Sequence, residues 1–397
     1  MSGVEERLAE LRESGLHRRL RLVESPQGPR VTLDGREVLL LCSNDYLGLA
    51  DSAEVRDAAA QAALRWGAGA GASRLISGNM ELHRRLEERL AAFKGYRAAL
   101  LFGSGYLANV GAISAFAGRG EVVCSDELNH ASIVDGCRLA RAETFVYRHG
   151  DMEHLAWGLR EAGGRASLIV SDGLFSMDGD VAPLADLHRL AREHGCRLMV
   201  DEAHATGALG PGGRGSVAAA GLSDEIDLVV GTLGKALGSY GAYICASAAL
   251  RELLLNTARP FIFSTAPPPP AVGAAQAALE LLEAEPERVE RLRSNAAVLR
   301  EGLAAEGLAT GGGQSQIVPL EVGDAALTMQ LCERLLERGV FAQGIRPPTV
   351  PEGTSRLRFS TMATHEKADL REAARLVGEA AREIGIAGMQ RPAAIAA

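Results

Sequence analysis

The chain has 397 residues, of which 47% are hydrophobic and 23% charged, and a formal net charge of -8. This length favours one large domain with a smaller one. The composition is typical of a globular protein, the negative charge argues against a nucleic-acid partner, and the apolar runs fall well short of the roughly 20 residues that a membrane span requires. Because the charged stretch at residues 1–15 is unlike a signal peptide, we expect a cytoplasmic protein with no membrane partner.

In chain order, the first 40 or so residues predict a helix and then a hairpin around Asp34 and Gly35. Short apolar runs of strand length follow, and most are separated by segments with helical spacing, such as 184–195. The runs cover residues 98–102, 121–126, 143–147, 166–172, 197–201, 227–231 and 241–246. This alternation predicts an α/β fold with a mostly parallel central sheet covered by helices. Ligands of such sheets bind beyond the carboxyl ends of the strands.

The remaining sequence predicts a long helical region, roughly 271–307, followed by a small α+β region with strands at 317–322 and 356–360 and a helix from about Glu366. The alanine-rich end, 391–397, is expected to fray. We therefore expect three parts: an N-terminal helix and hairpin segment (1–45), a large ligand-binding domain (46–285) and a small C-terminal α+β domain (286–397).

The cysteines lie far apart, and most of them fall inside apolar runs, which favours reduced core residues over disulfides or metal ligands. They are Cys42, Cys124, Cys137, Cys196, Cys245 and Cys332. We expect no metal site.

Lys235 is the most unusual residue of the sequence, because it stands between Gly234 and Gly238 directly after a buried strand. A solvated surface charge on a helix does not explain a lysine in this position. The room left by small neighbours would suit a cofactor aldehyde that forms an imine with the amine. A lysine that contacts a phosphate, or one that is only structural, is the alternative.

A second cluster lies in LMVDEAHATGALG, where Asp201 ends an apolar strand and His204 follows three residues later. A carboxylate at a buried strand end needs a cation or hydrogen-bond donors. An aspartate that faces the ring nitrogen of pyridoxal phosphate would keep this nitrogen protonated. An Asp/His pair that caps a loop is the alternative.

Two further segments add candidate ligand contacts. Gly103, Ser104 and Gly105 lie between a strand and a helical pattern, where backbone amides can hold a phosphate, although many such segments are only tight turns. The segment matches neither the nucleotide P-loop nor G-x-G-x-x-G. His130 follows another strand and could stack on a flat heterocycle.

These segments, in this order, resemble the pyridoxal-phosphate enzymes of the aspartate aminotransferase fold (fold type I), and within them the α-oxoamine synthases. The resemblance covers nearly the whole chain. Other matching stretches are SNDYLGL (43–49), GASRLISGNMELHRRLEERLAAFKG (71–95), GLFSMDGD (173–180), FIFSTAPPP (261–269) and IRPPTVPEGTSRLRFS (345–360). The resemblance implies that the cofactor is pyridoxal 5'-phosphate and that the protein is a homodimer with shared active sites.

The resemblance also implies catalytic roles. Lys235 would form the imine with the cofactor and later remove the substrate's Cα proton, while Asp201 would pair with the ring nitrogen. His130 would cover the face of the ring and assist proton movements. His204 and Ser176 would lie near the phenolate oxygen and the thioester carbonyl. Without the resemblance, Ser176 could be a turn hydroxyl bound to its own backbone.

The phosphate would be held by Gly105, Tyr106 and Thr232, and by Thr265 from the neighbouring subunit. Thr232 could equally cap the end of a strand.

Substrate carboxylates call for arginines, which bind them through two hydrogen bonds. Arg346 and Arg358 are candidates for the amino-acid carboxylate, and we favour Arg358, with help from Asn44. The family pattern assigns Arg18 to a distal acyl carboxylate and Thr349 to the acyl site, although an arginine-rich N-terminal helix is often only a solvated face.

The motifs are most similar to those of the family member that joins L-alanine to a pimeloyl thioester, with loss of CO2, in biotin biosynthesis. The thioester can be on CoA or on a carrier protein. An enzyme that joins glycine to acetyl-CoA, or one of broad specificity, is the alternative. A plain aminotransferase and a catalytically silent cofactor-binding subunit are two further interpretations, and the presence of Lys235 disfavours the second.

Overall fold

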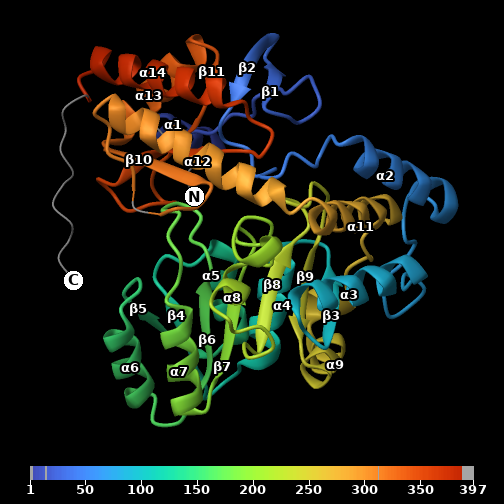
Figure 1. Cartoon of the computed structure of the whole chain (residues 1–397). Coiled ribbons are helices and arrows are strands. Elements are labelled where there is room, and N and C mark those ends of the chain that lie inside the picture. The colour runs from blue at the N-terminus through green and yellow to red at the C-terminus, as the bar shows by residue number, and fades with distance from the viewer. Residues whose placement is uncertain (1–2, 14–15, 312, 387–397) are drawn as a thin grey trace. The chain divides into compact units, whose positions relative to one another are not determined.

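The computed structural model describes residues 3–13, 16–311 and 313–386. The chain forms two compact units, which are treated separately below (Figure 1). Unit 1 comprises Met1–Ser43, Met177–Gly179 and Ser294–Ala397, and unit 2 comprises Asn44–Ser176 and Asp180–Arg293. The expected boundaries at residues 45 and 285 stay a proposal, and the expected tail at 391–397 lies outside the described residues.

A seven-stranded sheet with the order β3-β9-β8-β7-β6-β4-β5 forms the centre of unit 2. Its strands are β3 (Ala98–Phe102), β4 (Val122–Asp126), β5 (Glu143–Tyr147), β6 (Ala166–Asp172), β7 (Arg197–Asp201), β8 (Leu228–Thr232) and β9 (Ala242–Ala246). The pairs from β8 to β5 are parallel, whereas β9 runs antiparallel to both of its neighbours. The predicted strands and the mostly parallel sheet are confirmed.

The helices of unit 2 pack on this sheet or on the helices next to it. They are α2 (Ala53–Trp66), α3 (Glu81–Lys94), α4 (Gly105–Phe116), α5 (Ala131–Ala140), α6 (Met152–Glu161), α7 (Leu184–His194), α8 (Ser216–Ala219), α9 (Ala248–Thr257), α10 (Arg259–Ile262) and α11 (Pro269–Ala284), with a 3-10 turn at Pro211–Gly213. Helix α7, for example, buries Leu184, Leu187 and Leu190 and ends at Gly195 in the left-handed conformation.

On one face of the sheet, a continuous core joins α4, α5, α9 and α10 to the strands. Ile113, Ile133 and Leu254 from the helices pack there with strand residues such as Val170 and Val230. Because parallel strands are covered on both faces, they consist largely of buried apolar residues until their carboxyl ends. The last residues of β4, β6 and β7 are instead the buried carboxylates Asp126, Asp172 and Asp201.

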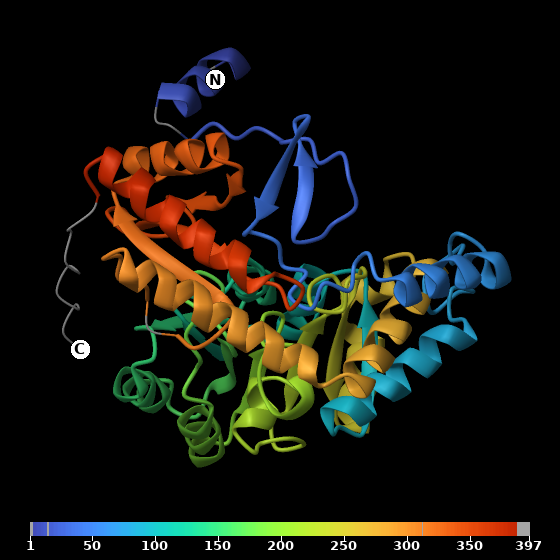
Figure 2. The same cartoon turned by 45° about the horizontal axis from the view of Figure 1, so that its top comes forward.

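Unit 1 combines both ends of the described chain. Strands β1 (Arg30–Leu33) and β2 (Arg36–Leu40) form a hairpin, and β2 pairs in parallel with β11 (Val340–Phe341). A second sheet has the order β10-β13-β12, from Ile317–Gly323, Ser355–Ser360 and Gln343–Ile345. Helices α1 (Val4–Glu13), α13 (Ala325–Glu337) and α14 (Lys367–Glu383) complete the unit, with blue β1 and β2 visible near the orange and red elements in Figure 2.

The expected helical region at 271–307 is two helices, because α11 ends at Ala284 and α12 spans Glu287–Ala305. Pro286 lies between them, and proline disfavours a helical conformation at the residue before it. The hairpin turn at Asp34 and Gly35 is confirmed, and both residues have positive φ, as a two-residue turn of this type requires.

All six cysteines are free thiols, and five of them are buried, as expected from the sequence. None of the helices in the described part of the chain combines the length and apolar character needed to cross a bilayer.

His365 generates a prediction about stability in acid. Its Nδ1 accepts a hydrogen bond from the Met362 amide, its Nε2 lies 3.1 Å from the Leu40 carbonyl oxygen, and burial lowers its pKa from 6.5 to about 4. In the unfolded chain His365 therefore becomes protonated below pH 6.5, whereas in the folded chain it becomes protonated only near pH 4. We expect stability to fall over this range by at most about 3 kcal/mol from this group.

Urea unfolding from pH 4 to 7 would measure the effect. The variant His365→Asn keeps an acceptor for the Met362 amide and should flatten the profile, whereas the control His188→Asn should not. An unchanged slope in His365→Asn would contradict the assignment.

Candidate active site

Lys235 lies in the loop after β8, and two glycines allow close packing between this loop and neighbouring segments of unit 2. A Cβ atom on Gly238 would lie 2.5 Å from the Ala50 nitrogen, and one on Gly207 would lie 2.4 Å from the Ala236 Cβ atom. Both glycines also have positive φ. The glycine-rich sequence near Lys235 thus lets the backbone approach its neighbours and holds the lysine in place.

A chain of hydrogen bonds leads from Lys235 to the beginning of unit 2. Lys235 Nζ lies 2.9 Å from His204 Nε2, and His204 Nδ1 lies 2.6 Å from the hydroxyl of buried Tyr46. This hydroxyl donates to Asn44 Oδ1 at 3.0 Å. Because Tyr46 donates its single proton to Asn44, Nδ1 of His204 donates to Tyr46, and Nε2 is left to accept from the Lys235 ammonium.

Asp201 lies opposite Asp172 across the β6–β7 pair, and both carboxyl groups are buried. Burial, and then the charge of Asp201, raise the pKa of Asp172 well above its usual range. Burial next to a second carboxyl group therefore favours the protonated form of Asp172. Asp201 accepts hydrogen bonds from the Ala203 amide at 2.8 Å and from Asn109 Nδ2 at 2.6 Å.

His130 is the residue that caps the N-terminus of α5, and this fixes its ring. Nδ1 accepts from the Ser132 amide at 3.2 Å and lies 2.7 Å from the Ser132 hydroxyl, to which Asn109 also donates. Burial lowers the pKa of His130, the nearby charge of Asp201 opposes this, and that of Lys235 reinforces it. These electrostatic effects show that the sheet edge brings His130, Asp172, Asp201 and Lys235 into one site, in which His130 is uncharged.

The residues expected at the phosphate lie at two places in unit 2. Gly105 is the first residue of α4, and a Cβ atom there would meet nothing within 4 Å, whereas Tyr106 donates to Asp135 at 2.6 Å. Thr232 ends β8, donates to the Gly241 carbonyl and accepts from the Gly234 amide. Thr232 therefore does cap its strand, as the alternative interpretation supposed, and its contact to a phosphate stays a prediction.

Ser176 and Thr265 lie in loops of the same unit. Ser176 is half-buried in a turn after β6, and Thr265 is exposed and forms an isolated β-bridge with Ser73. The proposed contacts of both residues to a cofactor stay predictions.

The arginine candidates belong to unit 1. Arg18, Arg346 and Thr349 line one cavity of about 560 Å³, together with Arg19 and Arg21. Its wall also includes His17, Met329, Cys332, Glu333, Leu336, Phe341, Ala342, Gln343, Gly344 and Ile345.

Glu333 pairs with Arg19 at 3.5 Å and with Arg21 at 2.6 Å, whereas Arg346 donates to the His17 carbonyl at 3.2 Å. Among the described residues, Arg18 has no carboxylate within ion-pair distance. The cavity thus combines a cation available for a ligand with an apolar wall.

Arg358 lies on β13 and is buried, as is Arg356 on the same strand. Arg356 forms an ion pair with Asp178. Neither arginine is a surface charge, and the assignment of Arg358 to a substrate carboxylate stays a prediction.

Comparison with known proteins agrees with this arrangement. The family model for aminotransferase class I and II matches residues 36–377. The chain belongs to this family. It is 54% identical over 384 residues to the 8-amino-7-oxononanoate synthase of Citrifermentans bemidjiense, covering 96% of this chain and 98% of the relative. It is 55% identical over 382 residues to that of Geobacter sulfurreducens, with the same coverage.

Solved structures give the same result for this aminotransferase-family chain. A serine palmitoyltransferase from S. paucimobilis with bound PLP has a TM-score of 0.92 at 34% identity and covers 97% of this chain and 98% of its own. An 8-amino-7-oxononanoate synthase from Francisella tularensis has a TM-score of 0.76 at 28% identity. The match covers 87% of this chain and 98% of the Francisella chain. The predicted family and the fold-type I architecture are confirmed.

The residues of the site fit pyridoxal phosphate, the cofactor of this family. Asp201 is a buried carboxylate that, among the described residues, has hydrogen-bond donors but no lysine or arginine partner, which suits a protonated ring nitrogen. The first turn of α4 at Gly105 has open space and backbone amides for a phosphate. Lys235 supplies the amine.

Three residues of this site escaped prediction from the sequence. The Tyr46 hydroxyl hydrogen-bonds to His204, and the Asn109 side chain donates to both Asp201 and Ser132. Asp172 adds a second carboxyl group next to Asp201 at the sheet edge. Asp172 ends an apolar strand in the same way as Asp201, and that signal could have revealed it. Asn109 lies in an apolar helix and Tyr46 in the SNDYLGL stretch, and only tertiary contacts reveal their roles.

A second buried lysine supports the segment that carries Asp201 and His204. Lys94 pairs with Glu202, and both side chains are at most 1% exposed. Glu202 also accepts from the Ser216 hydroxyl at 2.8 Å and the Val217 amide at 2.6 Å. This ion pair fixes the residue directly after Asp201.

Removing one partner of this pair should be costly. Lys94→Met leaves Glu202 buried without its cation, and we expect a loss of about 3–5 kcal/mol in stability, read from the urea midpoint. The exposed Lys367→Met is the matched control and should stay within about 0.5 kcal/mol of wild type. Lys94→Met with Glu202→Leu should recover part of the loss. If Lys94→Met matched the control, the pair would not stabilise the site.

Proposed function

We propose that this chain catalyses the condensation of L-alanine with a pimeloyl thioester, giving 8-amino-7-oxononanoate, CO2 and the free thiol, in biotin biosynthesis. The observation that carries the proposal is the position of Lys235, 2.9 Å from His204 and electrostatically linked to the carboxyl group of Asp172. The similarity to 8-amino-7-oxononanoate synthases over 96% of the chain supports this choice of reaction.

The cofactor and the protein divide the chemistry. Bound pyridoxal phosphate supplies an electron-withdrawing ring that stabilises a carbanion next to the amino group of the substrate. Asp201 holds the proton at the ring nitrogen, because its charge is not neutralised by a lysine or arginine among the described residues. Asn109 and the Ala203 amide orient this carboxylate through one hydrogen bond to each of its oxygens.

Lys235 and His204 handle protons. Transfer of a proton from Lys235 Nζ to His204 Nε2 leaves a neutral amine, which can accept the Cα proton of alanine. It also gives His204 an Nε2–H that can donate to a ligand oxygen. Tyr46 and Asn44 hold the imidazole in place during this exchange.

His130 acts beside them as an uncharged acid or base. Because Nδ1 accepts a hydrogen bond from the Ser132 amide, the proton of the neutral ring is on Nε2. The lowered pKa favours the neutral form of this imidazole, which suits a group that covers the face of the cofactor ring and moves protons.

Residues of unit 1 supply the acyl contacts in this proposal. Arg18 binds the distal carboxylate of the pimeloyl chain, Thr349 and Arg346 line the same cavity, and the apolar wall accepts the methylene groups. Arg358 and Asn44 bind the carboxylate of alanine. Ser176 contacts the cofactor or the thioester carbonyl.

We further propose a homodimer in which Thr265, exposed on its loop, completes the phosphate site of the neighbouring subunit together with Gly105, Tyr106 and Thr232. The cytoplasmic location also stays a prediction.

The covalent link between Lys235 and the cofactor can be tested sharply, because the sequence contains only three lysines, Lys94, Lys235 and Lys367. Borohydride reduction of the holoprotein, followed by proteolysis and mass spectrometry, should place the cofactor on Lys235 alone. Lys235→Ala should lose both the label and the activity. A label on Lys94 or Lys367, or none, would refute the assignment.

Substrate specificity tests the reaction itself. Alanine, glycine and serine are combined with pimeloyl, acetyl, succinyl and palmitoyl thioesters, and alanine with the pimeloyl thioester should react fastest. Arg18→Gln should raise the KM for the pimeloyl thioester about tenfold to a hundredfold through loss of a charged hydrogen bond, with little effect on the KM for alanine.

Arg7→Gln, on exposed α1, is the matched control. If glycine with acetyl-CoA were the fastest pair, the substrate assignment would be wrong, while the assignment of Lys235 would stand on the labelling result.

A further inference from the structure

We propose that His149 is a positioning residue that joins the two loops carrying His130 and Ser176. The inference rests on the proposed function, in which these two residues contact the cofactor and substrates. His149 follows β5 and is placed among neither the catalytic nor the binding residues.

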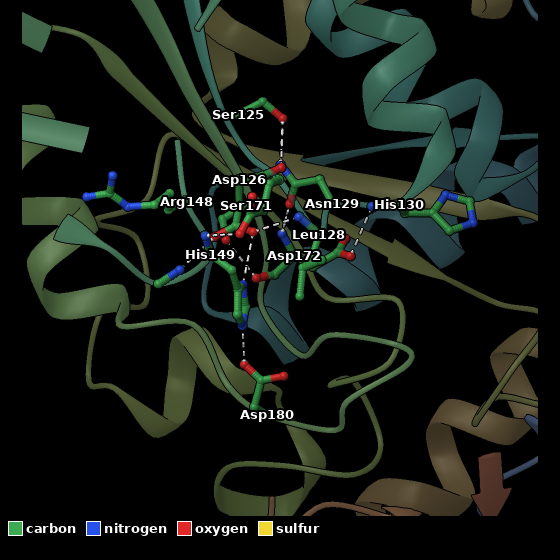
Figure 3. Close-up of polar contacts among 12 residues, drawn as sticks. Ser125, Asp126, Leu128, Asn129, His130, Arg148, His149, Ser171, Asp172 and Asp180 are labelled. Carbon is green, nitrogen blue, oxygen red and sulfur yellow. Dashed lines mark hydrogen bonds and ion pairs between the residues drawn. The ribbon is translucent and has the colours of Figure 1, made fainter. Parts of the chain in front are cut away.

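The ring of His149 lies between two carboxyl groups (Figure 3). Nδ1 lies 3.0 Å from Asp126 Oδ1, and Nε2 lies 2.9 Å from Asp180 Oδ2. Both ring nitrogens can donate only in the protonated imidazolium form. Phe175 packs edge-on against the ring, with centroids 4.4 Å apart, and this contact sets the plane of the imidazolium.

On one side, Asp126 connects the imidazolium to His130. Asp126 is buried at the end of β4, and its Oδ1 also accepts from the Leu128 amide at 2.9 Å, which shapes the turn before His130. Asn129 in this turn donates to the Val170 carbonyl at 2.9 Å and accepts from the Asp172 amide at 2.8 Å.

The connection ends at the His130 backbone, whose amide donates to Asp172 Oδ2 at 3.2 Å. Figure 3 shows His149 bonded to Asp126, Asp126 to the Leu128 amide, and both Asn129 and His130 to Asp172. A shift of Asp126 would therefore be transmitted to the residue that starts α5.

On the other side, Asp180 connects the imidazolium to the loop of Ser176. The Phe175 amide donates to the Asp180 carbonyl at 2.9 Å, and Leu174 forms a β-bridge with Val181. Asp180 and Phe175 thus close the loop on both sides of Ser176. His149 holds the Asp180 carboxylate and the Phe175 ring at the same time.

The surrounding charges favour a permanent cation. Burial acts to lower the pKa of His149, but the hydrogen bonds and charges of Asp126 and Asp180 outweigh it and raise the pKa to about 10. Glu127 accepts from the backbone amide of His149 at 2.9 Å, and the neighbouring Arg148 pairs with Asp151. The link between the loops therefore persists across the physiological pH range and is lost only as the pH rises toward 10.

The experiment compares His149→Gln and Asp180→Asn with wild-type holoenzyme, and uses His188→Gln on α7 as the control. Hydrogen exchange followed by mass spectrometry should show faster exchange in both 126–130 and 173–181 for His149→Gln, and in neither segment for the control. The kcat should fall about tenfold to a hundredfold in His149→Gln, since small misplacements of reacting groups have effects of this size.

The pH profile separates positioning from a merely structural role. Asp180→Asn removes one of the two carboxylates that raise the pKa of His149, so the alkaline limb of kcat/KM should move to lower pH by at least about one unit. Lost stability alone would lower activity at every pH and leave the limb in place.

The inference is overturned if only one segment exchanges faster in His149→Gln, or if Asp180→Asn loses activity without a shift of the alkaline limb. Failure of the proposed function has a different signature, because wild-type enzyme would then not condense alanine with the pimeloyl thioester. The exchange comparison decides the role of His149 in that case too.

Discussion

Two carboxyl groups meet where β6 and β7 end, and the rest of the site is arranged around the electrostatic repulsion between them. Asp172 and Asp201 are paired residues of adjacent parallel strands, buried in the edge where ligands of such sheets bind. Burial, and then the charge of Asp201, raise the pKa of Asp172 well above its usual range. Asn109 and a backbone amide fix the carboxylate that carries this charge, and a protonated heterocycle can satisfy it.

Local patterns predicted much of the fold, because buried parallel strands are short apolar runs and the helices between them have an apolar side. Strands β3 to β9 and helix α7 follow from such patterns. The patterns also indicated Lys235, Asp201 and His204, since each is polar at a place where the chain is otherwise apolar or small. The same reasoning merged α11 and α12, because helical periodicity continues across Pro286 although the backbone does not.

What the patterns could not reveal are pairs of residues far apart in the chain. Tyr46 and His204 are 158 positions apart, and Asn109 and Asp201 are 92 apart. Each side chain alone fits an ordinary structural role, and only the packing of residues 44–50 against His204 and the loop of Lys235 gives Tyr46 its partner. This packing requires glycine at position 238, since a side chain there would collide with Ala50.

The two lysines of the unit 2 core show how the same side chain acquires different roles. Lys94 is fully buried and faces the carboxylate of Glu202, so its charge is compensated by an ion pair. Lys235 is half-buried and faces the imidazole of His204, which accepts a hydrogen bond without supplying a negative charge. An ammonium beside a base can give up its proton to that base, whereas one beside a carboxylate gains little by doing so. The identity of the partner, rather than burial alone, therefore makes Lys235 the residue suited to chemistry and Lys94 the one suited to support.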